Sequence, residues 1–540
     1  MNQELAQLTL LRLVQAGIRK VCVCPGARNA PLIAALNENK DIIESLYFYD
    51  ERSAAFFALG EIMSSGNPVA VITTSGTAAG ELLPATMEAF YSGLSLVLIT
   101  ADRPKRYRGT GAPQCAEQVG IFGVYVSECL DVETPQDLSH SLKILDRPYH
   151  LNLCFDEPLL EKNASYRISS SPKIQTDLEI GPDVTDCVSQ VAKLKHFLTE
   201  IKNPLVIVGE LQPEVRASVL RFLLSWGAPT YFEALSGLRD SSDADSIRLP
   251  LGEQVIERAY LKKYPVDGVL RIGRIPTLRS WRDLEDKFAH LPVCSISSLP
   301  FSGLSRNTLN LQVPMTLFFE QALSVISTPV RSATDFLSEE AQRLKNLYRV
   351  FETHPTSEPA LMHFLARSFA PGSTVYLGNS LPIRHWDLAA SRDEKRFRIG
   401  ASRGLNGIDG QVSTFLGFAR KNTPNWGIFG DLTALYDLSA PWILKQLKET
   451  PVQIIVVNNQ GGKIFDRMFT QVEFQNQHQL SFKAWADLWG LEYLARASSL
   501  GHNLLLETFT SQKFTSHSHL IELKPENEAT QKFWKEFQAL

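Results

Sequence analysis

The chain has 540 residues, of which 44% are hydrophobic and 21% charged, and its formal net charge is −4. This balance is typical of a soluble globular protein and argues against a nucleic-acid partner, which would favour a basic excess. The length is too great for one hydrophobic core and predicts about three domains.

Three further features predict a cytoplasmic location. No stretch approaches the roughly 20 apolar residues of a membrane span. The N-terminus lacks a basic head, an apolar run and a cleavage site, so we expect no signal peptide. The seven cysteines are scattered through expected strands and helices and fit a reduced protein.

Helices and strands alternate from residue 1 to 175. We expect helices over residues 5–15 and from Ala30, and strands at 20–24, 69–74 and 94–100. This order predicts a doubly wound α/β domain. The polar stretch 162–183 has few core-forming residues and is interpreted as a linker.

Two more α/β regions are expected, at 176–335 and 336–540. The middle region lacks a G-x-G-x-x-G motif, so a dinucleotide site is not predicted there. A charged helix over 336–352 opens the third region. The strands expected in these regions are 203–209, 267–273, 292–298, 374–380, 426–429, 452–457 and 518–524.

Asp431 and Asn459 each follow an apolar strand of the third region, in WGIFGDL and VVNNQGG. Ligands of α/β sheets bind at the carboxyl ends of strands. Asp431, the amide oxygen of Asn459 and a backbone carbonyl near Gly461 would supply part of the octahedral oxygen shell of Mg²⁺, and a diphosphate would supply more. Both side chains could instead cap helices.

Glu51 is expected near the start of a helix, beside Phe56 and Phe57 in YDERSAAFFALG. Apolar neighbours raise the pKa of a carboxyl group, and such a group can share a proton with the aminopyrimidine ring of thiamine diphosphate. Alternatively, Glu51 only stabilises the helix dipole. The spacing of GD and NN, roughly 26 residues, resembles the thiamine diphosphate signature.

The resemblance becomes specific in eight strings that occur in order. They are CPGARNAPL, YDERSAAFFALG, TTSGTAAGELLPA, LITADRP, GNSLPIR, SRGLNGIDG, GDLTALYDL and NNQGGKIF. They are similar to those of the 2-succinyl-5-enolpyruvyl-6-hydroxy-3-cyclohexene-1-carboxylate synthases (MenD) of menaquinone biosynthesis. The match covers the first and third regions and is weak in the middle one.

The resemblance implies a transferase (carboligase, EC 2.2.1 type) that uses thiamine diphosphate and Mg²⁺, with Mn²⁺ as a possible substitute. Its substrates would be 2-oxoglutarate, which is decarboxylated, and isochorismate, which accepts the succinyl-semialdehyde carbanion equivalent. The fold implied is three doubly wound parallel-sheet domains: pyrimidine-binding (1–175), central (176–335) and diphosphate-binding (336–540). A homodimer or homotetramer is also implied, because the Glu51 and Asp431 halves would meet across a subunit boundary.

The resemblance also implies the site residues. The catalytic and substrate-binding set is Glu51, Arg28, Arg103, Gln114, Ser380, Arg384 and Arg403. The cofactor set is Glu51, Ser75, Gly76, Thr77, Ile408, Gly430, Asp431, Leu432, Asn459, Gly461, Ile464 and Phe465, with Asp431, Asn459 and Gly461 as metal ligands.

Several of these residues have plainer interpretations. The arginines could be solvated strand ends, and Ser380 could cap a helix that begins at Pro382. Ile408 could be core packing, and the turn at 75–77 could simply start a helix.

Three positions depart from the family pattern. Ala27 stands where the family commonly has Ser, Pro113 where it has Asn, and Arg279 is the nearest match to a family Lys of the middle region. The departures leave open a thiamine diphosphate-dependent decarboxylase or carboligase with another acceptor. A noncatalytic cofactor-binding protein on the same fold is a further alternative.

Overall fold

The computed structural model describes residues 1–144, 146–168, 187–326, 329–330, 332–466, 468–469, 471–497 and 516–540. The expected first domain boundary, at 175 and 176, lies outside these residues. The chain divides into two compact units. Unit 1 comprises 1–180, 402–454 and 483–491, and unit 2 comprises 181–401, 455–482 and 492–540.

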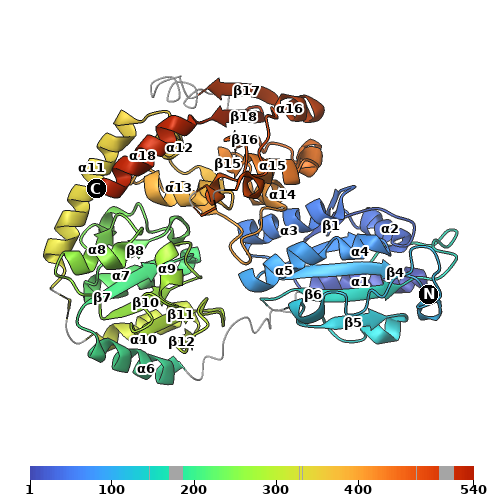
Figure 1. The fold of residues 1–540 in the computed structure, drawn as a ribbon. Helices are drawn as coiled ribbons and strands as arrows, with labels where there is room; N and C mark the ends of the chain where they lie inside the picture. Colours follow the sequence, from blue (N-terminus) through green and yellow to red (C-terminus); the bar gives the residue numbers. More distant parts are fainter. Residues whose placement is uncertain are drawn as a thin grey trace. The chain divides into compact units, whose positions relative to one another are not determined.

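The first sheet belongs to unit 1 and has six parallel strands in the order β2-β1-β3-β4-β6-β5 (Figure 1). Its central strands are apolar runs buried on both faces, as expected for a parallel sheet covered by helices. The sequence predicted β1, β3 and β4 but not β5 or β6. The strands are β1 (Lys20–Val23), β2 (Glu44–Tyr47), β3 (Val69–Thr73), β4 (Leu96–Asp102), β5 (Cys129–Val132) and β6 (Tyr149–Cys154).

Helices cover both faces of this sheet. Leucines of α1 (Asn2–Gln15) and α2 (Ala30–Glu38) share one core with the strands. Tyr166 is also buried in that core and Arg167 pairs with Asp41, so the part of the expected linker before residue 169 packs on the domain instead. The remaining helices are α3 (Glu51–Ser65), α4 (Thr77–Gly80) and α5 (Leu83–Ser92).

Helix α3 is buried along almost its whole length. It packs on β1, β3 and α5, and also on α14 (Gln411–Phe418) of the same unit. Gly60 and Gly417 lie where α3 and α14 cross, and each brings its helix backbone against the other. Unit 1 also contains β15 (Asn425–Gly430), α15 (Asp431–Tyr436), the 3₁₀ turn η9 (Ala440–Lys445) and α16 (Lys483–Trp489).

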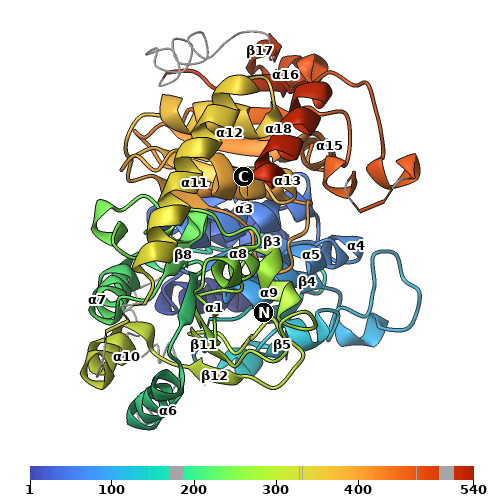
Figure 2. The same cartoon turned by 60° about the vertical axis from the view of Figure 1, so that its left-hand side comes forward.

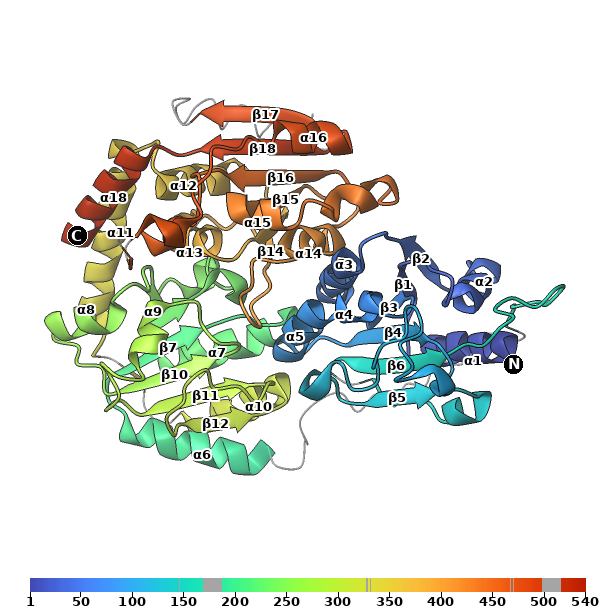
Figure 3. The ribbon, with the colours of Figure 1, turned by 45° about the vertical axis from the view of Figure 1, so that its right-hand side comes forward.

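The second sheet lies in unit 2, with the strand order β12-β11-β10-β7-β8-β9 (Figure 3). The sequence predicted β7, β10 and β11. The strands are β7 (Pro204–Val208), β8 (Thr230–Phe232), β9 (Arg248–Leu249), β10 (Gly268–Ile272), β11 (Val293–Ser297) and β12 (Leu309–Gln312). Two apolar cores flank the sheet; the helices around it are α6 (Cys187–Glu200), α7 (Arg216–Trp226), α8 (Val255–Leu261), α9 (Arg279–Asp283) and α10 (Met315–Ala322).

A long helix, α11 (Thr334–Thr353), follows the second sheet, as its charged, periodic sequence predicted. The buried pair of Arg258 and Glu340 ties it to α8. At its other end Phe351 stacks on Phe533 of α18 (Asn527–Ala539), with ring centroids 5.5 Å apart. Figure 2 shows α11 and α18 lying together.

The third sheet has the order β14-β13-β15-β16-β18-β17. The predicted strands β13, β15, β16 and β18 are present, whereas β14 and β17 were not predicted. The elements not yet bounded are β13 (Thr374–Leu377), β14 (Arg398–Gly400), β16 (Val452–Val457), β17 (Glu492–Ala497), β18 (His519–Lys524), α12 (Glu358–Ser368) and α13 (Leu381–Ala389). Three six-stranded parallel sheets with flanking helices confirm the predicted α/β fold class.

Among the described residues, no helix combines the length and the apolar character needed to cross a membrane.

Candidate active site

Glu51 is the first residue of α3, directly after the N-cap Asp50, whose side chain accepts a hydrogen bond from Ser53 N. Burial raises the pKa of the Glu51 carboxyl, and the nearby carboxylates of Asp50 and Glu81 act in the same direction. The apolar setting expected from the sequence therefore has its predicted effect. A carboxyl group of this kind takes up and shares a proton more readily than a solvated one.

Asp431 is the first residue of α15 and is 2% exposed. The N-cap position of α15 is Gly430, so Asp431 does not cap the helix. One carboxylate oxygen, Oδ1, accepts a hydrogen bond from the amide of Leu432 at 2.7 Å. The carboxylate is thus fixed at the carboxyl end of β15, where an oxygen ligand is expected.

Asn459 follows β16 in unit 2 and is 8% exposed. Its Nδ2 donates to Glu358 Oε2 at 2.9 Å, whereas its Oδ1 is buried and has no hydrogen-bond partner among the described residues. A buried carbonyl oxygen without a partner is costly, and such an atom is an open acceptor for a cation. Asn459 therefore fits a Mg²⁺ ligand better than a helix cap.

Gly461 lies two residues further along, with φ +139°. A Cβ at this position would lie 2.6 Å from the carbonyl oxygen of Gln475. The backbone that follows Asn458 and Asn459 can adopt this positive φ and this close approach to Gln475 only with glycine at position 461. The strands β15 and β16 that precede the two polar side chains are neighbours in the third sheet.

The turn Ser75–Gly76–Thr77 joins β3 to α4 in unit 1. Gly76 has φ +85°, and its amide donates to Gln118 Oε1 at 2.8 Å. Gln114 packs against this turn, because a Cβ on Gly76 would lie only 3.3 Å from its Cα. Ser75 is buried, while Thr77 and Gln114 are exposed. The structure thus brings together two motifs that are far apart in the sequence.

Arg103 follows β4, and its Nε donates to the carbonyl oxygen of Pro113 at 2.9 Å. One family departure, Pro113, therefore orients an expected substrate-binding arginine through its backbone. A few residues further along the chain, Arg108 donates hydrogen bonds to both carboxylate oxygens of Asp131. Burial alone would raise the pKa of Asp131, but hydrogen bonds from Arg108 and Asn152 outweigh it and hold the pKa at about 2.

Arg28 is buried in the turn before α2. Its Nη1 donates to the carbonyl oxygen of Phe155 at 3.0 Å and lies 3.4 Å from the carboxylate of Glu157. Asn29 stabilises the turn by accepting from Gly26 N and donating to Cys24 O, both at 2.9 Å. Arg28 thus has structural partners, and only part of its guanidinium is engaged by them.

The loop of Arg403 and Ile408 is held by Glu88 of α5, in the same unit. The two carboxylate oxygens of Glu88 accept from the amides of Gly404 and Leu405, each at 2.7 Å. Gly410, with φ +64°, closes the loop against α3, since a Cβ there would overlap the ring of Phe56. Ile408 is half-buried, and Glu88 and the loop residue Gly407 line a hollow of about 290 Å³.

Comparisons with known proteins agree with this geometry. Residues 3–121 match the family model "Thiamine pyrophosphate enzyme, N-terminal TPP binding domain". The chain is 41% identical over 549 residues to 2-succinyl-5-enolpyruvyl-6-hydroxy-3-cyclohexene-1-carboxylate synthase of Bdellovibrio bacteriovorus, covering 100% of this chain and 99% of the relative. The chain belongs to this synthase family.

The enzyme of the same name from Akkermansia muciniphila is 36% identical over 533 residues, covering 95% of each chain. That from Bacillus pumilus is 29% identical over 503 residues, covering 86% of this chain and 84% of the relative. As a member of the synthase family, the protein is a thiamine diphosphate-dependent enzyme of the transferase type, and its family acts in menaquinone biosynthesis on small-molecule substrates.

Two of the predicted site residues, Arg384 and Ile464, line a cavity of about 700 Å³ in unit 2. Arg384 is exposed, and its Nη1 donates to the carbonyl oxygen of Thr277 at 2.9 Å. Lys463, from the GGKIF string, lines the same cavity, as do Glu358 and His385. The lining thus carries the cations Arg384, Lys463 and Lys535 together with the carboxylates of Glu253, Glu358 and Asp466.

Ser380 occupies the N-cap position of α13 with φ +73°, but its side chain makes no capping hydrogen bond. The capping interpretation is therefore not supported. Arg279 begins α9, where its Nε pairs with Asp283 at 2.9 Å on the surface. The structure gives Arg279 a surface partner.

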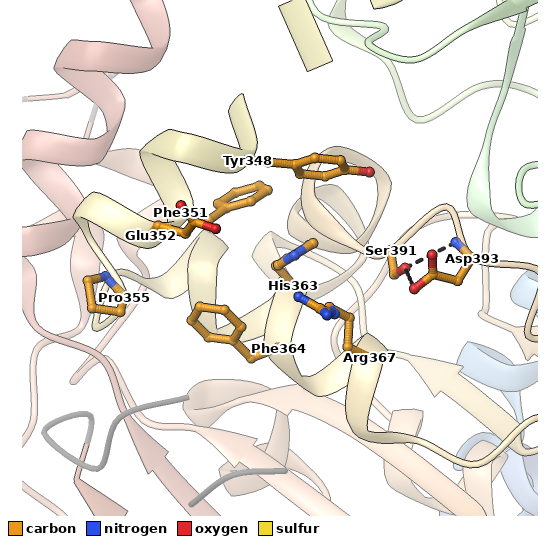
Figure 4. Close-up of a pocket in the computed structure, with 9 residues that line it drawn as sticks. All are labelled: Tyr348, Phe351, Glu352, Pro355, His363, Phe364, Arg367, Ser391 and Asp393. Carbon is orange, nitrogen blue, oxygen red and sulfur yellow. Dashed lines mark hydrogen bonds between the residues drawn. The ribbon is translucent and has the colours of Figure 1, made fainter. Parts of the chain in front are cut away.

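A second hollow of unit 2, of about 360 Å³, lies between α11 and α12. Its lining includes the rings of Tyr348, Phe351, His363 and Phe364 (Figure 4). The His363 ring stacks on that of Phe351, with ring centroids 4.7 Å apart. None of the residues predicted for the active site lines it.

The predicted site residues divide between the two units. Unit 1 holds Arg28, Glu51, Ser75, Gly76, Thr77, Arg103, Gln114, Arg403, Ile408, Gly430, Asp431 and Leu432. Unit 2 holds Ser380, Arg384, Asn459, Gly461, Ile464 and Phe465.

Sequence reasoning missed three residues that hold these loops: Gln118, Glu88 and Glu358. Each acts through a hydrogen bond to a residue far away in the sequence. No local pattern marks such a residue, because its partner is defined only by the fold.

Proposed function

We propose that the protein decarboxylates 2-oxoglutarate on thiamine diphosphate and joins the remaining four-carbon unit to isochorismate, forming 2-succinyl-5-enolpyruvyl-6-hydroxy-3-cyclohexene-1-carboxylate. The observation that carries the proposal is the 41% identity to a synthase of that name along the whole of both chains. The half-buried carboxyl of Glu51 and the open amide oxygen of Asn459 agree with it.

Asp431, Asn459 and Gly461 would hold a divalent cation together with the diphosphate of the cofactor. We propose Mg²⁺ as the natural ion, with Mn²⁺ able to replace it, because carboxylate, amide and carbonyl oxygens suit both ions. The unpartnered Oδ1 of Asn459 supports this assignment. Gly430, Leu432, Ile464 and Phe465 would line the same cofactor site, and Ile408 would lie beneath it.

Glu51 would hold a proton against the aminopyrimidine of the cofactor. Its raised pKa favours this sharing, since the proton then costs less to keep near neutral pH. Bound thiamine diphosphate supplies the electron sink for decarboxylation. Ser75, Gly76 and Thr77 would meet the pyrimidine side.

Both substrates are dicarboxylates, which require fixed cations. Arg28, Arg103, Arg384 and Arg403 would bind these groups, because a guanidinium can hold a carboxylate through two parallel hydrogen bonds. Gln114 and Ser380 would add neutral hydrogen bonds. Arg103 is held through its Nε, and its two outer nitrogens would be the ones that meet a substrate carboxylate.

We also propose a homodimer or homotetramer in the cytoplasm. The seven cysteines form no disulfide, which suits a reducing compartment. Sedimentation of the active enzyme at assay concentration tests the assembly, and an active monomer would contradict it.

The decisive experiment measures CO₂ release and adduct formation from 2-oxoglutarate and isochorismate, with the cofactor and Mg²⁺ withheld in turn. We expect both products only when all four components are present. Ala27 and Pro113 motivate the competing assignment to a different acceptor. Turnover of 2-oxoglutarate that ignores isochorismate would favour that competing assignment.

A further inference from the structure

Glu358 lies in the first turn of α12. It is unusual among charged residues because it is only 4% exposed. Its Oε2 accepts from Asn459 Nδ2 at 2.9 Å. Its Oε1 lies 3.1 Å from Nδ1 of His385, without the alignment of a hydrogen bond. All three side chains belong to unit 2 and are nearly excluded from solvent.

The amide of Asn459 has two ends of almost equal size but opposite chemistry. The oxygen accepts hydrogen bonds and binds cations, whereas the NH₂ group only donates. Rotation of the amide by half a turn would direct NH₂ hydrogens at a cation and remove one ligand. A metal-binding asparagine therefore needs a partner that distinguishes its two ends.

An ionised carboxylate makes this distinction, because it accepts and cannot donate. With Glu358 Oε2 facing the amide, only Nδ2 can point towards it, and Oδ1 must point away. That Oδ1 is the atom that lacks a partner. The contact thus fixes the amide in the orientation that a cation requires.

We propose that Glu358 is a positioning residue for the metal site and holds the oxygen of Asn459 towards the cation. Nδ1 of His385 lies 3.1 Å from the second oxygen of Glu358, and the His385 ring packs near Trp534, with centroids 5.8 Å apart. The inference rests on the proposed function, because it takes Asn459 as a metal ligand. Partners of this kind in the outer shell of metal sites typically alter affinity by about 10–100-fold.

The first test titrates Mn²⁺, followed by its electron paramagnetic resonance signal, into the full chain with thiamine diphosphate. Glu358→Ala should weaken Mn²⁺ binding about 10–100-fold. Glu358→Gln keeps an acceptor oxygen for Nδ2 but can also donate, so it distinguishes the two ends of Asn459 less well and should weaken Mn²⁺ binding, though by less than Glu358→Ala. Circular dichroism and thermal melting check that each variant is folded.

Glu352→Ala is the matched control. This glutamate is exposed on α11 of the same unit and lines the aromatic hollow instead. Its Mn²⁺ affinity should equal that of wild type. Equal weakening by Glu352→Ala and Glu358→Ala would overturn the proposal, because the loss would then not depend on the contact with Asn459.

The second test asks whether orientation itself is the role of Glu358. A carboxylate at position 459 has an oxygen at both ends and needs no orienting partner. The double variant Glu358→Ala/Asn459→Asp should therefore regain at least about 10-fold of the Mn²⁺ affinity lost in Glu358→Ala. A purely structural role for Glu358 predicts that Asn459→Asp changes Mn²⁺ affinity by the same factor in wild type as in Glu358→Ala, whereas an orienting role predicts a larger gain in Glu358→Ala.

Two results would overturn the inference while the proposed function stands: unchanged Mn²⁺ affinity in Glu358→Ala, or a double variant as weak as the single one. The proposed function would fail separately, if wild type with thiamine diphosphate bound no Mn²⁺ and released no CO₂.

Discussion

The crossing of α3 and α14 makes a sharp prediction, because two glycines face each other's backbone there. A Cβ on Gly417 would lie 2.9 Å from Glu61 N and overlap the carbonyl oxygen of Phe57, whereas ordinary Cβ contacts begin at 3.4 Å. A Cβ on Gly60 would lie 2.7 Å from Phe418 N. Because the overlaps with the carbonyl oxygens of Phe57 and Thr414 are deeper still, rigid backbone must move by about an ångström or more.

Gly417→Ala should consequently destabilise unit 1. Overpacking costs about 1–3 kcal/mol, and the upper end applies because backbone atoms are displaced. The gain in helix propensity from Gly to Ala, about 1 kcal/mol, offsets part of this and leaves a loss of about 2 kcal/mol. Gly60→Ala should weaken the same contact, so the double variant should cost less than the sum by at least about 0.5 kcal/mol.

Urea unfolding followed by circular dichroism measures the loss, and hydrogen exchange of α3 and α14 peptides locates it. Gly80→Ala, in the last position of α4, is the control, because nothing lies within 4 Å of a Cβ there. It should be neutral or slightly stabilising. The reasoning is refuted if Gly417→Ala is as stable as Gly80→Ala, or if the two crossing variants are additive.

Three further predictions concern buried charges. Burial raises the pKa of Asp437 to about 6 against the opposing hydrogen bonds from Ser413, so ionising it costs the folded state roughly 3 kcal/mol. The wild-type protein avoids this cost below pH 4, where Asp437 is protonated, and loses the corresponding stability as the pH rises through 6. Urea unfolding across this range should show that Asp437→Asn becomes more stable than wild type by about 3 kcal/mol at the higher pH. Parallel curves of unfolding free energy against pH for the two proteins would contradict this prediction. Glu51→Gln should lower kcat by about 10²–10⁴ with cofactor affinity nearly unchanged, as rate and binding assays would show; unchanged turnover would remove Glu51 from its role. Arg258→Ala leaves the carboxylate of Glu340 buried alone and should cost about 3–5 kcal/mol in urea unfolding, whereas replacing both partners with Met and Leu should cost much less.

The strands that the sequence predicted are mainly apolar runs buried along nearly their whole length. Runs such as 69–73 and 452–457 are apolar at all positions but one, and parallel strands covered on both faces favour that pattern. The strands that were missed are partly exposed, short or polar, as in β5 (Cys129–Val132) and β14 (Arg398–Gly400). At such sheet edges tertiary packing decides the structure and local preference carries little information.

The prediction of a linker at 162–183 was wrong for its first part, for a related reason. The segment 162–168 is polar overall, yet one aromatic residue, Tyr166, is buried and Arg167 pairs with Asp41. The average composition of the segment is polar, and it does not reveal that the single side chain of Tyr166 is buried in the core. Its partners lie more than a hundred residues earlier, so no local window could reveal them.

The site shows the same division between what is local and what is not. For Glu51, Asp431 and Asn459 the structure confirms the expected places at helix starts and strand ends, and their roles toward the cofactor stay predictions. Gln118, Glu88 and Glu358 could not be predicted, because each is defined by a partner distant in sequence.

These three residues share a physical task. Loops at strand ends leave the hydrogen-bonded ladder of the sheet, so their amide groups need other acceptors once they are buried. Gln118 supplies one acceptor to the backbone amide of Gly76, and Glu88 supplies two to backbone amides of the Arg403 loop. Glu358 supplies one acceptor to the side-chain amide of Asn459. In each case the acceptor lies on another element, so the position of the loop is set by packing between elements. Changes at these acceptors should therefore alter ligand affinity before they alter stability, since each contact orients one loop while the sheets beneath it remain intact.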